Sequence, residues 1–328
     1  MRRLARTGGP ILLVCAAFLA GWVRLPYYAL GPGPARDVTP LIHVAGTRTY
    51  GSSGHYVLTT VRFAQVTAVG ALVAWIDPDR TVVPQEVVYP PGLTPTEEAR
   101  RAASQMDQSK IDAAFVVLTL LTDYPDDHRS GALIEQVVTG CSADGRLAAG
   151  DVIHRIDGER VSSAEDASAV LGDVAPGGSV TMTVETVDGA REVRIAKGRC
   201  PGIDESIFGI TTIDPFPLEI SIESGDVGGP SAGLMWGLGL YDLLTPGDLT
   251  RGRTIAGTGQ IDPEGRILPI GAITDKVVAA LEAGADVLFV PKRNASQIAD
   301  VKTGGMQVIP IETFEDAVAA LEATEPPA

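Results

Sequence analysis

Alternating apolar and polar positions predict short strands in the first third of the chain. Between residues 38 and 83, β-like runs alternate with turn residues, and residues 56–61 and 71–76 are two examples. No pattern typical of catalysis occurs in this part. We therefore expect residues 35–129 to form a mixed region of strands and helix, and the sequence indicates no role for it.

A helical pattern begins at Thr94. This residue can cap a helix, Pro95 suits the first helical position, and Glu97 can bond back to the cap. We expect the helix to continue to about residue 121, with an interruption near Asp107.

From residue 130 to residue 200 the pattern returns to short strands, with one helix among them. Residues 132–138 and 192–196 have the composition of strands, and apolar side chains alternate with other residues over 180–184. The segment 163–166 resembles a capping box and predicts a helix that ends near residue 171. This part is expected to be a β-rich domain.

In the last third, the pattern predicts a strand, a glycine-rich loop and then two helices. Residues 218–223 alternate as a strand does, and the loop at 224–229 is rich in glycine. Pro230 and Ser231 then open an apolar helix, and residues 272–281 predict a second helix.

The N-terminus predicts a membrane anchor. Arginines precede an uncharged apolar run at residues 11–23, and residues 8–30 would give about 20 residues or more if Arg24 reaches the membrane surface. The N-terminal arginines place that end in the cytoplasm and the rest of the chain outside. A cleaved signal peptide is the alternative.

Composition narrows the classes of partner. A net charge of −15 argues against nucleic-acid binding and against polybasic attachment to lipid, because both need clustered cations. Cys15 lies in the apolar run, whereas Cys141 and Cys200 lie in the part expected outside the cytoplasm, where oxidation is permitted. A disulfide between these two is one expectation, and two unrelated buried thiols are the alternative.

Ser231 is the candidate nucleophile. A hydroxyl at a helix entrance is well placed to attack a carbonyl group. Free backbone N–H groups there, including that of Gly229, would stabilise the oxygen that becomes negative. The alternative is that Ser231 only caps the helix.

Lys276, near the start of the second predicted helix, is the candidate base. A lysine accepts a proton only in its neutral form, so its pKa must fall from about 10.4 to roughly 7–8. Apolar neighbours and the positive end of a helix both disfavour the ammonium ion, and Lys276 is placed for both effects. The alternative is an ordinary surface lysine.

Together these segments resemble the proteolytic domain of the Lon protease family. The resemblance covers residues 218–294 and rests on pieces in a family-like order: residues 229–233, 258–261 and 265–271, Lys276, residues 287–291 and Asn294. It implies that Ser231 is the nucleophile, that Lys276 is the general base, and that the hydroxyl of Thr258 helps to orient the lysine.

The chain departs from this family at two positions, and neither is Ser231 or Lys276. Gly228 stands where an acidic residue is usual, and Gln260 stands where glutamate is usual.

No Gly-x4-Gly-Lys-Ser/Thr phosphate loop occurs in the sequence, so the resemblance implies proteolysis without ATP. All histidines precede this domain, which argues against a Ser-His-Asp triad. His-Glu-x-x-His is absent and no cysteine follows Cys200, and we expect neither a metal nor a cofactor.

Residues 130–200 resemble a PDZ domain. The resemblance rests on Leu-Ala-Ala-Gly-Asp-Val-Ile at 147–153, Ile-Asp-Gly at 156–158, and a helix followed by Pro-Gly-Gly at 176–178. In this family a peptide adds as a strand to a sheet edge, and its carboxylate rests on backbone N–H groups. By position, the resemblance implies five consecutive peptide-binding residues: Ser130, Gly131, Ala132, Leu133 and Ile134. A PDZ fold that serves only as a rigid spacer is the alternative.

The order of these parts resembles a bacterial family of membrane-anchored, PDZ-containing, ATP-independent Lon-like proteases. The expected fold is α+β and multidomain, and it has four parts: an anchor and linker at 1–34, the mixed region at 35–129, a PDZ-like domain at 130–200, and a Lon-type α/β proteolytic domain at 201–328. The expected function is cleavage of unfolded or flexible polypeptides outside the cytoplasm, and the resemblance implies a homo-oligomeric ring. The rival hypothesis is a membrane-tethered binding protein with an inactive Lon-like domain.

Overall fold

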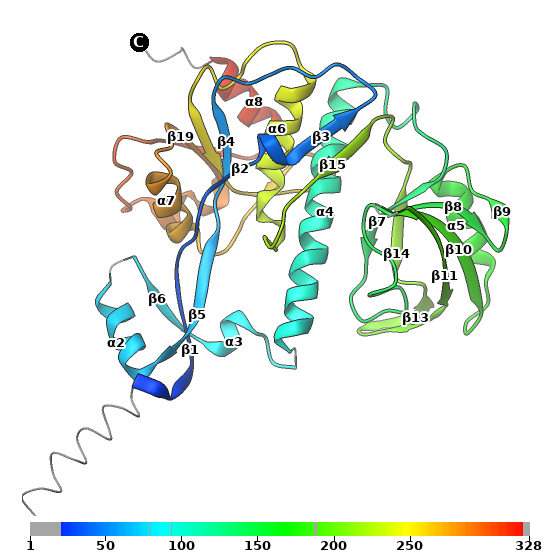
Figure 1. Cartoon of the computed structure of the whole chain (residues 1–328), viewed down its shortest axis with the longest axis horizontal. Coiled ribbons are helices and arrows are strands. Elements are labelled where there is room, and N and C mark those ends of the chain that lie inside the picture. Colours follow the sequence, from blue (N-terminus) through cyan, green and yellow to red (C-terminus); the bar gives the residue numbers. More distant parts are fainter. Residues whose placement is uncertain (1–20, 78, 93, 187–188, 324–328) are drawn as a thin grey trace, which may run out of the picture.

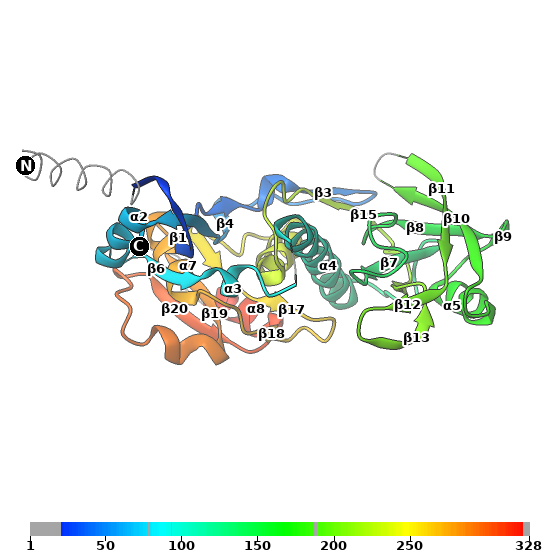
Figure 2. The ribbon, with the colours of Figure 1, turned by 90° about the horizontal axis from the view of Figure 1, so that it is seen from below.

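The computed structural model describes residues 21–77, 79–92, 94–186 and 189–323, and three bodies can be followed in it (Figure 1). A central domain of helices and strands lies between a small arm and a β-rich domain (Figure 1, Figure 2). The long helix α4 stands between the central domain and the β-rich domain.

A five-stranded sheet forms the middle of the central domain. Its strands lie in the order β2-β4-β16-β19-β20, and all neighbours are parallel except β2 and β4. The bounds of these strands are Arg36–Asp37, His55–Leu58, Thr254–Gly257, Val287–Pro291 and Gln307–Ile311. Helices α6 (Gly233–Leu244) and α8 (Phe314–Ala323) pack on one face, and α7 (Ile273–Glu282) packs on the other.

Side chains of this sheet alternate between two cores, because successive residues of a strand point to opposite faces. Tyr56 and Phe289 are buried on the face of α6 and α8, whereas Val57 and Leu288 are buried on the face of α7. Burial of such a side chain contributes about 1.5–3 kcal/mol. The two cores therefore fix the two helices that carry the candidate site.

Part of the central domain comes from the region for which the sequence indicated no role. Strand β4 is an interior strand of the sheet, and β3 (Ile42–Ala45), after the 3-10 helix η1 (Thr39–Leu41), pairs with β15 (Glu219–Ile222). The domain is completed by the small pair β17 (Gln260–Ile261) and β18 (Ile267–Leu268) and by the 3-10 helix η3 (Lys292–Ile298).

Helix α4 spans Pro95–Leu121. As predicted, the Thr94 hydroxyl accepts the Glu97 N–H, and the Glu97 carboxylate accepts the Thr94 N–H. The expected interruption near Asp107 is absent, because buried residues such as Met106 and Ala113 pack in the core that α4 shares with α6. The helix is therefore one continuous support beside the central domain.

The arm is an antiparallel sheet in the order β5-β1-β6, with bounds Val61–Thr67, Arg24–Pro32 and Thr81–Pro84. Helix α2 (Ala68–Ile76) packs on it, and the short helix α3 (Gln85–Val88) follows β6. The strand predicted at residues 71–76 is wrong, because Thr67 accepts the Gly70 N–H and starts a helix there. A short apolar run does not by itself distinguish a strand from a helix.

The predicted anchor at residues 11–23 lies almost entirely outside the described residues. Its extension to residue 30 is wrong, because the chain from Arg24 onward forms β1, whose backbone pairs with β5 on one side and β6 on the other. Within the ranges that the structure describes, no helix has both the length and the apolar character needed to cross a bilayer.

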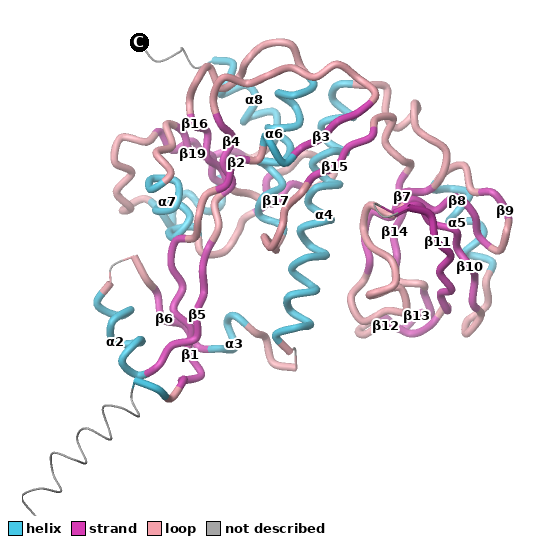
Figure 3. Tube along the Cα trace, viewed as in Figure 1, coloured by secondary structure: helices cyan, strands magenta, loops and turns pink. Residues whose placement is uncertain are grey.

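The β-rich domain is built on a sheet in the order β11-β10-β8-β7-β14, with β9 beside β8 (Figure 3). The strands, in chain order from β7, span Ala132–Val137, Val152–Ile156, Glu159–Arg160, Ser179–Thr186, Gly189–Ala196 and, for β14, Ile210–Ile213. Helix α5 (Ala164–Asp173) starts at the predicted cap Ser163. Val180, Met182 and Val184 are buried in one core, as their alternation predicted.

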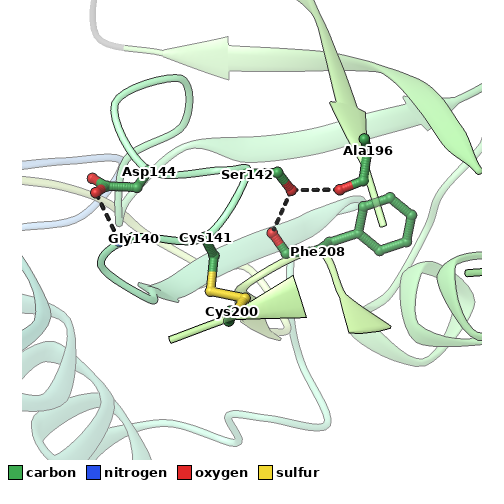
Figure 4. The surroundings of a disulfide bond; sticks show 7 residues. All are labelled: Gly140, Cys141, Ser142, Asp144, Ala196, Cys200 and Phe208. Carbon is green, nitrogen blue, oxygen red and sulfur yellow. Dashed lines mark hydrogen bonds between the residues drawn. A yellow bond between two sulfur atoms is a disulfide. The ribbon is translucent and has the colours of Figure 1, made fainter. Parts of the chain in front are cut away.

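A disulfide joins Cys141 to Cys200, which is the pairing expected from the sequence (Figure 4). Cys200 ends β12 (Gly198–Cys200), which pairs with β13 (Ile203–Ile207) just before β14. Next to it, the Ser142 hydroxyl bonds to the carbonyl groups of Ala196 and Phe208. These links hold the segment that leads to β14 against the loop after β7.

Candidate active site

Ser231 lies at the entrance of helix α6, within the 3-10 helix η2 (Pro230–Ala232). Gly229 precedes it with φ of 87°, a conformation that glycine adopts without strain. The Ser231 hydroxyl makes no capping bond to η2 or α6, so the alternative of a simple helix cap is wrong. The hydroxyl instead faces a lysine.

Lys276 lies in the first turn of α7 and is only 5% exposed, so the alternative of a surface lysine is also wrong. Its Nζ lies 2.6 Å from the Oγ of Ser231 and 2.9 Å from the Oγ1 of Thr258. Helices α6 and α7 pack on opposite faces of the same sheet, and the side chains of Ser231 and Lys276 reach each other from these two sides. Two hydroxyl groups from separate elements thus converge on one buried amine.

The surroundings of Lys276 disfavour its charge. Burial lowers the pKa of its ammonium group from 10.5 to about 8. The positive end of the α7 dipole acts in the same direction, because Lys276 lies in the first turn of that helix. A substantial fraction of the amine is therefore neutral at mildly alkaline pH, and a neutral amine can accept the proton of a hydroxyl group.

Thr258 links the lysine to the backbone of the serine. Its hydroxyl donates to the Ser231 carbonyl oxygen at 3.1 Å, which leaves oxygen lone pairs to accept an N–H of Lys276. The neighbouring Gly259 N–H donates to the same carbonyl at 2.8 Å. The turn between β16 and β17 therefore holds both the position of Ser231 and the direction of the amine.

The role expected for Gly229 is wrong in this structure. Its backbone N–H donates at 2.7 Å to the carbonyl oxygen of Ala102 in α4, so it is not free to bind an oxyanion. Gly228 explains a departure from the Lon pattern, because a Cβ at this position would lie 2.9 Å from the Cβ of Ala102. No acidic side chain fits where the loop approaches α4 so closely.

Asn294 and Ala102 support the site through contacts with residues far away in the sequence. The Asn294 side chain is buried and bonds to both the N–H and the carbonyl of Ile270, each at 3.0 Å, just before α7. Ala102 belongs to α4, far from the serine in sequence. No local sequence pattern predicts either contact, because both depend on the packing of segments that are distant in the sequence.

A cavity of about 820 Å³ lies beside Ser231 and Lys276. Most of its lining is apolar and comes from outside the segment that resembles Lon: Leu30, Val61, Phe63, Val87, Val88 and Met106. Arg36 and Asp226 supply polar groups in the lining. The shape and lining of the cavity suit an apolar side chain of a polypeptide.

Among the described residues, no group of His, Cys, Asp and Glu is arranged to hold a metal ion.

The predicted peptide-binding residues, Ser130, Gly131, Ala132, Leu133 and Ile134, do not form a free sheet edge. Strand β7 pairs with β8 on one side and with β14 on the other, so a further strand has no place beside it. The prediction is wrong because β14 follows the domain in sequence and returns to cover this edge. Strand β14 is instead the last strand of the sheet.

Two protein families match parts of the chain. Residues 214–323 match the Lon protease (S16) C-terminal proteolytic domain, which includes Ser231, Thr258 and Lys276. Residues 120–185 match the PDZ domain. The matched regions lie in the central domain and in the β-rich domain, together with the end of α4.

Individual relatives and solved structures are similar over parts of the chain. The Lon protease of Paraburkholderia phytofirmans is 30% identical over 156 residues, which are 43% of this chain and 18% of that protein. Lon protease 2 of Herpetosiphon aurantiacus is 26% identical over 226 residues, 66% of this chain and 26% of that protein. The chain thus spans about a quarter or less of the length of these relatives.

Among solved structures, the PDZ domain of an SdrC-like protein from Listeria monocytogenes is 23% identical with a TM-score of 0.24. The match covers 25% of this chain and 87% of that one. The two family matches show that the chain combines a PDZ domain with the C-terminal proteolytic domain of Lon protease (S16).

Proposed function

We propose that this chain is a serine endopeptidase in which Ser231 is the nucleophile and Lys276 is the general base. The observation that carries the proposal is the 2.6 Å distance between the Lys276 Nζ and the Ser231 Oγ, made by a buried lysine. Because its pKa is lowered to about 8, a far larger fraction of this amine than of an ordinary lysine is neutral near pH 7–8 and able to accept a hydroxyl proton. Thr258 is proposed as the residue that orients this amine.

The proposed reaction has two acyl-transfer steps. The Ser231 Oγ bonds to the scissile carbonyl carbon while its proton moves to the Lys276 Nζ, and that proton passes to the leaving amine as the C–N bond breaks. Water then attacks the acyl-enzyme ester and gives a proton to Lys276. The bond to Oγ breaks, the proton returns to Ser231, and two shorter polypeptides are released.

Backbone N–H groups of Ser231 and Ala232 are the proposed donors to the oxyanion. Both residues belong to η2, and the first N–H groups of a helix have no partner in a preceding turn. The positive end of the helix favours the negative charge that develops there. Gly229 is not part of this proposal, because its N–H binds Ala102.

The proposed substrates are unfolded or flexible polypeptides, cleaved without ATP. The sequence contains no phosphate-loop motif, so we assign no unfolding step to the chain. The apolar cavity beside Ser231 supports a preference for substrates with an apolar side chain next to the cleaved bond.

The proposed location is the outer side of the cell membrane, and the proposed anchor is the apolar run at residues 11–23 together with the uncharged residues just before it. The arginines before this run and the apolar run itself support that orientation. The disulfide between Cys141 and Cys200 also supports an oxidising compartment. A homo-oligomeric ring stays a prediction.

Cleavage of casein by the full chain in detergent tests the proposal. We expect cleavage without nucleotide and no increase with ATP, and we expect Ser231→Ala and Lys276→Ala each to abolish it. The matched control is Lys292→Ala, since Lys292 is exposed and pairs with Glu312 outside the site. Activity retained in Lys276→Ala would refute the base, and activity retained in Ser231→Ala would refute the nucleophile.

Peptide binding by the PDZ domain is proposed at the edge of β14 rather than β7. In the described sheet, β14 is the terminal strand, and α5 lies beside it, where the Asp214 carboxylate accepts the N–H of Ala164. A peptide could add as a strand between β14 and α5. Hydrogen exchange with a bound C-terminal peptide should then slow at β14 and α5, and slowing confined to residues 130–134 would contradict this assignment.

The rival function is a membrane-tethered binding protein whose Lon-type domain is inactive. It predicts peptide binding without any cleavage of casein and without labelling of Ser231 by a fluorophosphonate. Cleavage restricted to the chain itself would indicate self-processing alone. The buried amine beside the hydroxyl favours the protease, because a scaffold gains nothing from burying a charge-bearing lysine.

A further inference from the structure

Helix α2 in the arm presents its large apolar side chains outward. The small residues Ala71 and Ala74 pack against the arm's sheet. The outward side chains, which we call the α2 face, are each between 48% and 79% exposed: Val69, Leu72, Val73, Trp75 and Ile76. An apolar surface of this kind marks a contact with a membrane or with another molecule.

This arrangement is the reverse of an ordinary surface helix, which turns its apolar residues to the core and its polar residues to water. From Ala68 to Ile76, α2 contains no charged residue. The outer side of this helix is therefore apolar, and its exposure to water is unfavourable.

The α2 face begins beside the point at which the chain leaves the predicted anchor. The apolar run covers residues 11–23, and the next residue, Arg24, pairs with Thr67, the cap of α2. Figure 1 shows α2 packed at this end of the arm, away from the β-rich domain. An anchor embedded in a bilayer would therefore hold α2 close to the lipid.

We propose that the α2 face inserts into the interfacial region of a lipid bilayer, and this inference rests on the membrane anchor proposed above. The nine residues of α2 extend about 14 Å, too short to cross a hydrocarbon core of about 30 Å, so the helix lies along the surface. Trp75 suits this boundary, because tryptophan accumulates at membrane–water interfaces. With a net charge of −15, insertion of apolar side chains drives the contact, rather than attraction to anionic lipid.

Docking of α2 would also set the height of the candidate active site above the membrane. Leu30 of β1 and Phe63 of β5 belong to the same arm and line the cavity beside Ser231. The arm therefore connects the lipid contact to the substrate cavity. Polypeptide segments that emerge near the membrane surface would be the substrates within reach.

Quenching of Trp75 by brominated lipid tests this inference. The full chain is reconstituted into phosphatidylcholine vesicles with or without bromine on the acyl chains. Trp236 is fully buried, and Trp22→Phe removes the other tryptophan, so Trp75 becomes the reporter. We expect brominated lipid to lower the Trp75 emission roughly twofold, with little change when salt is added.

Two variants and one separation complete the test. Trp22→Phe with Trp75→Phe should show no quenching, and Leu72→Glu with Val73→Glu in the reporter chain should lose the quenching while the chain still floats with the vesicles. An unquenched Trp75 in a floating chain would overturn the α2 contact but not the anchor, and emission that then changes on dilution would indicate a second copy on this face. A chain that does not float would overturn both proposals.

Discussion

Burial of Lys276 suits it to act as a base, but it also lowers the stability of the folded protein. Its pKa is about 8 in the folded chain and about 10.4 in an unfolded chain. Between these pH values the folded protein binds fewer protons than the unfolded one, so stability rises as the pH rises through this window. At pH 7 the folded protein holds a buried ammonium, which is unfavourable.

Lys276→Met should therefore stabilise the protein while abolishing cleavage. We expect a gain of about 1–3 kcal/mol at pH 7, because the buried charge is removed and two hydrogen bonds are lost. The gain should shrink as the pH rises from about 8 to about 10.4. Urea unfolding of both chains at several pH values measures it, and a variant that is less stable at pH 7 would show that burial does not disfavour the charge.

Asp112 in α4 is a second buried group that opposes stability at neutral pH. Burial raises the pKa of its carboxyl group to about 7, although a bond from Gln108 acts against this. Because the folded state keeps the proton that the unfolded state loses, stability falls as the pH rises from about 4 to about 7.

We expect Asp112→Asn to raise the free energy of unfolding at pH 8 by up to about 4 kcal/mol, with a gain that declines toward pH 4. Thermal unfolding at pH 4, 6 and 8 checks this. The control is Asp107→Asn on the same helix, whose more exposed carboxylate pairs with Lys110 and should matter by less than about 1 kcal/mol. A gain of equal size at every pH would point to packing rather than charge.

Helix α4 supports the loop that carries the candidate nucleophile. Gly229 bonds to Ala102, and Gly228 approaches the same residue too closely to accept a side chain. Gly228→Ala should therefore displace Ser231 and lower kcat/KM for casein about 10–100-fold, with little effect on folding. The double variant Gly228→Ala with Ala102→Gly should recover much of the activity, because the two Cβ atoms no longer collide.

Gly172→Ala is the matched control for this prediction, since a Cβ there meets no other atom within 4 Å. Full activity in Gly228→Ala would mean that the loop does not depend on its contact with α4. Failure of Ala102→Gly to restore activity would place the effect elsewhere in the loop.

Local sequence patterns predicted some elements well and contacts between distant elements poorly. Thr94 and Glu97 cap α4 as expected, and the alternation at Val180 and Val184 gave a buried strand. The residues brought together at Lys276 were anticipated through a family resemblance, not through periodicity. The free edge expected at β7 and the free N–H expected at Gly229 failed, because β14 and Ala102 reach these places from remote parts of the chain.

The proteolytic domain extends beyond the family match at residues 214–323. Strand β4 lies inside its sheet, and Tyr56, Leu58 and Met106 are buried in its core. A fragment of residues 201–328 should therefore fail to fold, because loss of these side chains removes several kcal/mol of burial. Circular dichroism and hydrogen exchange, compared with the full chain, check this, and a cooperative unfolding transition in the fragment would contradict it.

If a neutral Lys276 activates Ser231, the rate at which a fluorophosphonate labels the full chain should depend on pH. Mass spectrometry should locate the label on Ser231, with a rate that rises about tenfold per pH unit below pH 8 and levels off above it. Lys276→Met should remove both the labelling and its pH dependence. Labelling at another residue would exclude Ser231 as the nucleophile. Labelling of Ser231 at a rate that changes neither with pH nor with the loss of Lys276 would exclude Lys276 as its base.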